Sequence, residues 1–145
     1  MYQFRLQRVL VYRRRQTERC ARDMSEAQRL LRQDQAQLDV LRDEERVCRE
    51  RIDELQDRAL PGVELKLWLD AYRGLAQRID RQEIATAQSA ARVDQERQAL
   101  LEAQRKEQTI DTLRAKGQRQ HALDEATREQ ELLDERTITR LNHEH

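Results

Sequence analysis

The chain has very little of what either a globular core or a disordered segment requires. Aromatic residues make up 3% of its 145 residues, so bulky apolar material for a three-dimensional core is scarce. Proline occurs once and glycine three times, whereas disordered chains are usually rich in both. The composition therefore argues against an ordinary globular domain and against a disordered tail.

Long hydrophobic runs and catalytic patterns are also missing. No apolar run approaches the roughly 20 residues that cross a bilayer, so we expect no transmembrane segment. The first twenty residues contain six arginines, which is unlike a secretory signal, and the cytoplasm is the expected location. The glycines stand far apart and the three histidines lack metal-ligand spacing, so neither a phosphate-binding loop nor a metal site is expected. We therefore expect no enzyme and no cofactor.

What is abundant is helix-forming material. Charged residues make up 39% of the chain, with 28 basic and 28 acidic side chains, and the common residues are Arg, Gln, Glu, Leu and Ala. All five favour helices. Such a mixture with a sustained apolar repeat is typical of long helices.

A heptad repeat runs through the first part of the chain without a slip. Its positions, alternately four and three residues apart, are Leu6, Leu10, Arg13, Thr17, Cys20, Met24, Ala27, Leu31, Asp34, Leu38, Leu41, Glu45, Cys48, Ile52 and Leu55. Eleven of these fifteen are apolar. A repeat of 3.5 residues held this long predicts one side of a coiled-coil seam, meaning the stripe of residues along which two helices pack.

The lone proline marks a turn. Leu60-Pro61-Gly62 ends the first repeat, because Pro61 lacks a backbone donor and Gly62 permits a tight turn. A second apolar repeat follows at Val63, Leu65, Trp68, Tyr72, Leu75, Ile79, Val93, Leu100, Ala103 and Ile110, with a register skip expected near Leu113. The prediction is an all-α fold: one antiparallel coiled-coil hairpin domain over residues 1–145, with helix 1 about 3–59, the turn about 60–62, and a longer helix 2 about 63–140.

Folding about Pro61 predicts which polar seam residues meet. Asp34 should face the small polar residues Gln82, Thr86, Gln88 and Ser89. Glu45 should lie beside Gln77 and Arg78, and Thr17 should face Arg105. Polar layers of this kind fix register at some cost in stability.

The same arithmetic leaves the C-terminal end without a partner. Met1 reaches only to about His121, yet residues 121–145 still carry an apolar stripe that includes Leu123, Leu133 and Leu141. This segment either frays or packs on another protein.

Two further features suggest partner contacts. Residues 1–32 hold nine basic and three acidic side chains, whereas residues 33–60 hold five basic and nine acidic ones. The first helix is thus positive at its N-terminal end and negative at its C-terminal end, the opposite of what the helix dipole favours. The Arg13-Arg14-Arg15 run is therefore a candidate contact for an acidic surface, or else a solvated helix face. Nucleic-acid binding is a weaker alternative, because the run lacks interleaved aromatic residues. After the turn, we expect Trp68 to close the hairpin, and Leu69 with nearby exposed residues to contact a partner.

The two ends of the chain resemble the FliJ family of bacterial flagellar export proteins. Residues 4–13, FRLQRVLVYR, are similar to the opening of that family, and residues 129–135, EQELLDE, resemble its acidic end. Tyr72 stands where members often carry a tyrosine early in the second helix. The Leu60-Pro61-Gly62 turn and the Asn142–His145 end depart from the pattern.

The resemblance implies a stalk and escort protein of flagellar type III export. Family members bind the hexameric export ATPase FliI through their joined ends, contact the export gate protein FlhA and escort export chaperones. On this chain the ATPase-facing residues would be Phe4, Leu6, Arg13, Arg14 and Arg15 with Leu123, Leu133 and Leu141, and the gate contact would include Leu69 and Tyr72. The protein would be a monomer when unbound and would associate peripherally with the inner membrane through the export apparatus.

Three other functions remain open at this point. The nearest alternative is the equivalent stalk protein of a virulence type III secretion system. A homodimeric coiled-coil scaffold would have twice the 17.4 kDa mass in solution. A nucleic-acid-binding hairpin would show retention that falls with salt.

Overall fold

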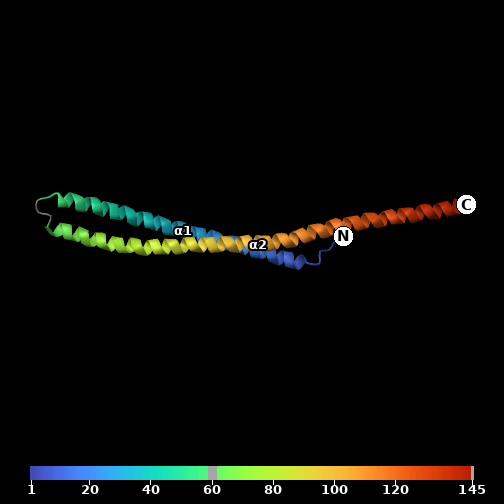
Figure 1. Ribbon diagram of the computed structural model, residues 1–145, viewed down its shortest axis with the longest axis horizontal. Coiled ribbons are helices and arrows are strands. Elements are labelled where there is room, and N and C mark those ends of the chain that lie inside the picture. The colour runs from blue at the N-terminus through green and yellow to red at the C-terminus, as the bar shows by residue number, and fades with distance from the viewer. Residues whose placement is uncertain (59–61, 145) are drawn as a thin grey trace. The chain divides into compact units, whose positions relative to one another are not determined.

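The computed structural model describes residues 1–58 and 62–144, and the regular structure within them is α-helical. Helix α1 spans Gln7–Gln56 and helix α2 spans Gly62–Glu144 (Figure 1). The two helices pack against each other as a hairpin whose second helix is the longer, so the predicted fold class is confirmed. In the predicted turn, Leu60 and Pro61 lie outside the described residues. Gly62 opens α2 with a φ of 59°, a left-handed conformation that glycine adopts without strain.

The chain divides into two units by proximity of its Cα atoms. Unit 1 contains Met1–Glu18 and Leu101–His145, and unit 2 contains Arg19–Leu100. Each unit therefore holds a segment of α1 beside a segment of α2.

Ion pairs show that these segments are antiparallel. In unit 2, Arg51 Nη2 lies 2.7 Å from Glu64 Oε1, and Arg42 Nη2 lies 3.2 Å from Glu83 Oε1. The partner's number rises along α2 as the arginine's number falls along α1. This is the order that an antiparallel hairpin requires.

The helices begin and end at slightly different residues from those expected. Helix α1 starts at Gln7 rather than near residue 3, after a turn in which the Gln7 N–H donates to the Phe4 carbonyl at 3.1 Å. No Ser, Thr, Asp or Asn precedes it to cap an earlier start. At the other end, the Arg58 N–H donates to the carbonyl of Leu55, three residues earlier, at 3.2 Å. Such a three-residue turn commonly closes a helix, and α1 ends at Gln56 rather than near residue 59. Helix α2 continues to Glu144.

The predicted seam of α1 is confirmed position by position. All fifteen residues of the heptad repeat from Leu6 to Leu55 are buried or half-buried, and Leu10 and Leu55 are fully buried. The facing positions on α2 also alternate in threes and fours. In unit 2 they include Leu65, Trp68, Tyr72, Leu75, Ile79, Gln82, Thr86, Ser89, Val93, Glu96 and Leu100, and in unit 1 they include Ala103, Glu107, Ile110, Arg114, Gly117 and His121.

Two expectations about the α2 seam were wrong. Val63 is 77% exposed, so the seam begins at Leu65 instead. The expected skip near Leu113 is absent: Leu113 is exposed, and the seam continues through Arg114 and Gly117 in unbroken register. Seam positions can be occupied by a glycine or by an arginine whose aliphatic stem packs. A prediction that followed only the apolar residues therefore placed the seam incorrectly here.

The polar layer at Asp34 is the best-defined register marker in unit 2. The Gln82 amide donates to the Asp34 carbonyl at 3.0 Å and lies 3.4 Å from its carboxylate, while the Ser89 hydroxyl donates to the other carboxylate oxygen. These are two of the residues that the sequence placed opposite Asp34. Sliding the helices by one heptad would leave this half-buried carboxylate without its donors.

The other two predicted polar layers differ from expectation. The Glu45 carboxylate accepts a long hydrogen bond of 3.5 Å from the Tyr72 hydroxyl rather than a contact from Gln77 or Arg78. The Thr17 hydroxyl donates to the Arg13 carbonyl of its own helix at 3.1 Å. A threonine in a helix often satisfies its hydroxyl locally, which removes the need for a partner across the seam.

The two serines of the chain allow a matched test of the Asp34 layer. Ser89→Ala should lower the free energy of unfolding by about 1 kcal/mol, because the carboxylate loses a donor. Ser25→Ala, at an exposed position of α1, makes the same chemical change outside the seam and should not destabilise. Urea unfolding followed by circular dichroism measures both; equal stabilities would show that the layer contributes nothing.

Candidate partner-binding surfaces

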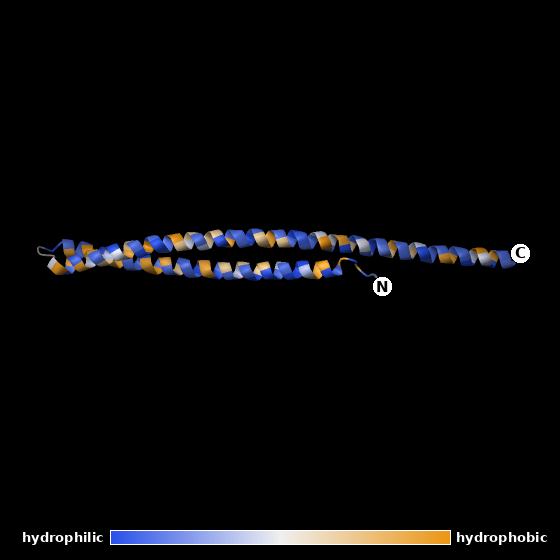
Figure 2. Ribbon diagram, turned by 90° about the horizontal axis from the view of Figure 1, so that it is seen from below, coloured by the Kyte–Doolittle hydropathy of each residue, from blue (hydrophilic) through white to orange (hydrophobic). Residues whose placement is uncertain are grey.

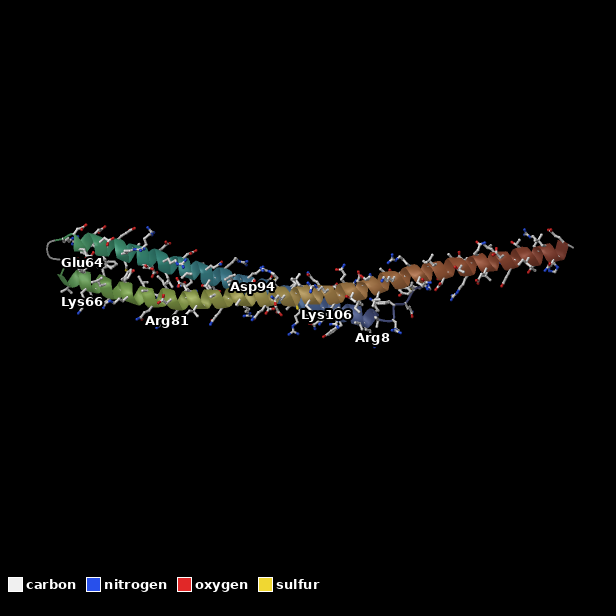
Figure 3. All side chains as sticks on the ribbon, viewed as in Figure 1. Arg8, Glu64, Lys66, Arg81, Asp94 and Lys106 are labelled. Carbon is white, nitrogen blue, oxygen red and sulfur yellow. The ribbon has the colours of Figure 1, made fainter. Side chains whose placement is uncertain are left out.

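The candidate surfaces are exposed faces of the two helices. Charged side chains cover the outer faces of both helices (Figure 3). Among the described residues, no three His, Cys, Asp or Glu side chains gather closely enough to hold a metal ion. Neither helix, over the same residues, contains a stretch long and apolar enough to cross a membrane.

Unit 2 carries an apolar groove between α1 and α2. It has a volume of about 480 Å³ and is lined by Val40, Asp43, Glu44, Val47, Cys48, Trp68 and Leu75. Val40 and Val47 are 49% and 51% exposed, although both are aliphatic. They stand one heptad apart, beside the seam residues Leu41 and Cys48, so one face of α1 presents both of them. Asp43 and Glu44 give this groove an acidic edge.

The three residues singled out after the turn take different places around this groove. Trp68 packs against the core cluster of unit 2 and also lines the groove, which agrees with a closing role. The Tyr72 ring packs on the same cluster and its hydroxyl donates to Glu45, so Tyr72 already makes contacts within the hairpin. Leu69 is half-buried and is not among the residues that line the groove.

An ion pair joins the last turns of α1 to the first turn of α2. The Arg51 guanidinium donates to Glu64 at 2.7 Å and to Glu54 at 2.9 Å. The hydrogen bond from Arg51 is the main cause that lowers the pKa of Glu64 below its usual 4.5. The charged form of Glu64 also suits the first turn of a helix.

The three arginines of the N-terminal run are not equivalent. Arg13 is half-buried on the seam and its guanidinium carbon lies 5.6 Å from the centre of the Tyr12 ring. Arg14 lies 3.7 Å from both Glu107 and Asp111 of α2, so its charge is partly satisfied inside unit 1. Arg15 is exposed, as is Arg8 (Figure 3). Arg15 is therefore the member of the run most accessible to a partner.

Phe4 and Leu6 are half-buried in unit 1. They belong to residues 1–6, which precede α1 and lie along α2 as far as His121. There the Tyr2 and His121 ring centroids are 5.4 Å apart. The chain's N-terminus thus lies beside α2 well before the C-terminal end of that helix (Figure 1).

The predicted overhang is present. Every residue of α2 from Ala122 to Glu144, named here the tail, is exposed. Leu123, Leu133 and Leu141 are 63%, 55% and 52% exposed, and hydrophobic residues recur along the tail in Figure 2. The tail carries seven acidic and three basic side chains, a balance of −4, whereas residues 1–18 carry five basic and one acidic, a balance of +4.

The apolar stripe changes sides where the pairing ends. At about 100° per residue, Leu123, Leu133 and Leu141 lie on one side of α2, and the seam residues Gly117 and His121 lie on roughly the opposite side. The next four seam-side positions in the tail are charged, namely Asp124, Arg128, Glu131 and Glu135, and Ile138 follows them on that side. A partner of the tail stripe must therefore approach α2 from the side away from α1.

These features define a class: a two-helix hairpin whose described residues leave aliphatic side chains exposed, in the groove of unit 2 and along the tail. The model of the flagellar FliJ protein family matches residues 2–144, and the chain belongs to that family. The family is a non-catalytic component of flagellar type III export, so the expected absence of enzymatic activity follows from membership. No curated protein and no solved structure matches the chain significantly.

The sequence predictions missed Val40, Val47 and the groove between them and Trp68. The signal was available, because aliphatic residues one heptad apart at positions flanking a seam widen the apolar face beyond what two helices bury. The depth of the groove, in contrast, depends on how Trp68 and Leu75 pack, which spacing does not specify.

The Arg51–Glu64 pair predicts a pH dependence. Because the folded pKa of Glu64 is depressed, its contribution is complete above 4.5 and is lost as pH falls through the lower folded value. The melting temperature of the wild type should exceed that of Glu64→Gln near neutral pH, and the difference should vanish in acid. Asp70→Asn, an exposed change on the same helix, is the control. A difference between wild type and Glu64→Gln that grows on acidification would contradict the assignment.

Proposed function

We propose that this chain is the stalk and escort protein of a flagellar export apparatus. Its unit 1 end binds the hexameric export ATPase (FliI), its groove in unit 2 binds the export gate protein (FlhA), and it also carries export chaperones. The observation that supports the proposal most is the tail, because a helix of this length with an exposed apolar stripe has no partner within unit 1. The protein would act in the cytoplasm, at the inner-membrane base of the apparatus.

The proposed mechanism is a stalk inside a ring. A single helix with its apolar stripe on one side cannot contact six identical subunits in the same way. It would therefore bind some subunits of the ATPase better than others and bias assembly or nucleotide state by that difference in affinity. The opposite charges of the tail and of residues 1–18 would select oppositely charged patches on the ring and orient the stalk.

The groove in unit 2 supports the gate assignment. Val40 and Val47 are exposed beside Trp68, a residue type enriched in binding hot spots, and Asp43 and Glu44 edge the same groove. An amphipathic segment with a basic flank fits such a groove. Of the two residues that the family resemblance suggested for this contact, Tyr72 packs against the core cluster beside the groove residue Trp68, and Leu69 does not line the groove.

Adjacent leucines of the tail provide the test of the ATPase contact. Leu133→Asp should weaken binding to the purified export ATPase at least about tenfold and reduce its stimulation, because the stripe loses a central apolar residue. Leu132→Asp is the matched control: Leu132 is equally exposed, at 54%, but points about 100° away around the helix.

Charge reversal of Arg15 provides a second measurement on the same complex. Arg15→Glu should weaken the ATPase contact, with a difference that fades at high salt, while the exposed Arg49→Glu should not. Arg14 is avoided because its reversal would also break its contacts with Glu107 and Asp111. Failure of the wild-type chain to bind or stimulate the ATPase would overturn the proposed function.

The gate contact is tested at Val47. Val47→Asp should lower affinity for the export gate protein about tenfold, because it places a carboxylate in an apolar groove whose edge is already acidic. Ile84→Asp makes the corresponding change at a 60% exposed aliphatic residue outside the groove. Equal binding by the two variants would place the gate contact elsewhere.

A further inference from the structure

The N-terminal residues Met1–Leu6, named here the strap, close the paired end of unit 1. Tyr2 lies against His121 with an angle of 44° between the rings, and its hydroxyl lies over Gly117. His121 Nε2 is 2.9 Å from Glu125 Oε1, close enough for an ion pair when protonated but not aligned as a hydrogen bond. The exposed tail begins at the next residue, Ala122.

The position of the Tyr2 side chain explains why a glycine, Gly117, stands inside the long helix α2. Glycine within a helix is less favourable than alanine because it restricts more backbone freedom on folding. At Gly117 a Cβ would overlap the Tyr2 hydroxyl and meet its Cζ at 3.0 Å, so the missing side chain makes room for Tyr2. At Gly74, in unit 2, a Cβ would meet nothing within 4 Å. A Cβ added at Gly117 would therefore displace Tyr2, whereas one added at Gly74 would displace nothing.

The closed strap also half-buries two of its own residues that the proposed function needs. Phe4 and Leu6 are half-buried while the strap is closed. The strap is anchored to α1 by two backbone bonds, from the Gln7 N–H to the Phe4 carbonyl at 3.1 Å and from the Leu10 N–H to the Leu6 carbonyl at 2.9 Å. The strap is a terminal segment of six residues that precedes α1, and chain termini are among the elements that open locally.

We propose that the strap is a releasable clasp, in which Tyr2 seated on Gly117 and His121 keeps Phe4 and Leu6 covered until the ATPase captures the open form. The gating step rests on the proposed function, whereas the clasp itself does not. When the strap opens, the two apolar side chains become available next to the tail, within the same unit.

Because the strap can close, the apparent affinity for the ATPase is the intrinsic affinity multiplied by the fraction of molecules whose strap is open. A partner that binds only the open form has an apparent Kd equal to its intrinsic Kd divided by that fraction. A change that opens the strap in every molecule therefore tightens binding without adding a contact.

Gly117→Ala tests the clasp, with Gly74→Ala as its matched control. Both changes add one Cβ to α2, but only the first displaces Tyr2, whose hydroxyl is the end of a movable side chain. Amide hydrogen exchange at Gln7 and Leu10 should be several-fold faster in Gly117→Ala than in Gly74→Ala or the wild type. Tyr2→Ala should reproduce this increase, and combining it with Gly117→Ala should add nothing further.

Two outcomes would overturn the proposal. Equal exchange in Gly117→Ala and Gly74→Ala would show that Tyr2 does not hold the strap. Faster exchange in Gly117→Ala and Tyr2→Ala without a lower Kd for the export ATPase would refute the gating step. If the wild-type chain itself does not bind the ATPase, the proposed function fails, while the exchange measurement still decides whether the clasp exists.

Discussion

The packing of one apolar stripe of α1 against one stripe of α2 is the interaction on which the rest of the structure depends. Neither helix is apolar enough to be buried all round, and their charged outer faces cannot drive association. The seam supplies the apolar burial, and the half-buried Asp34 with Gln82 and Ser89 fixes which residues meet. Because the register is fixed, the seam also determines where the N-terminal end of α1 lies along α2, and so which part of α2 extends beyond α1.

A two-helix hairpin buries only one side of each helix. Over the described residues, the outer faces of both helices therefore stay exposed. The switch of the apolar stripe from the seam side to the opposite side after His121 separates two tasks along one helix. The part before it packs against α1, and the part after it, Ala122–Glu144, is exposed throughout. The FliJ family, to which the chain belongs, is a component of flagellar type III export.

The pattern of the sequence predicted the fold well because heptad spacing is a direct consequence of helix packing. The fifteen seam positions of α1, the partnering of Asp34 and the overhang beyond His121 all follow from counting residues. Counting failed where a seam position is not apolar, as at Arg114 and Gly117, and where an apolar residue is off the seam, as at Val63. It also did not predict that Arg14 would be engaged by α2, or that Val40 and Val47 would edge a groove, because these depend on side-chain packing.

The most direct test of the seam is a distance measured across it within one molecule. Spin labels at Ser25→Cys and Gln98→Cys, with Cys20 and Cys48 replaced by alanine, should lie roughly 20–30 Å apart, since paired helices have axes about 10 Å apart. The distance should persist when labelled protein is diluted with an excess of unlabelled chain. A separation of roughly 110 Å, as along one continuous helix, or a short distance that disappears on dilution, would contradict an intramolecular hairpin.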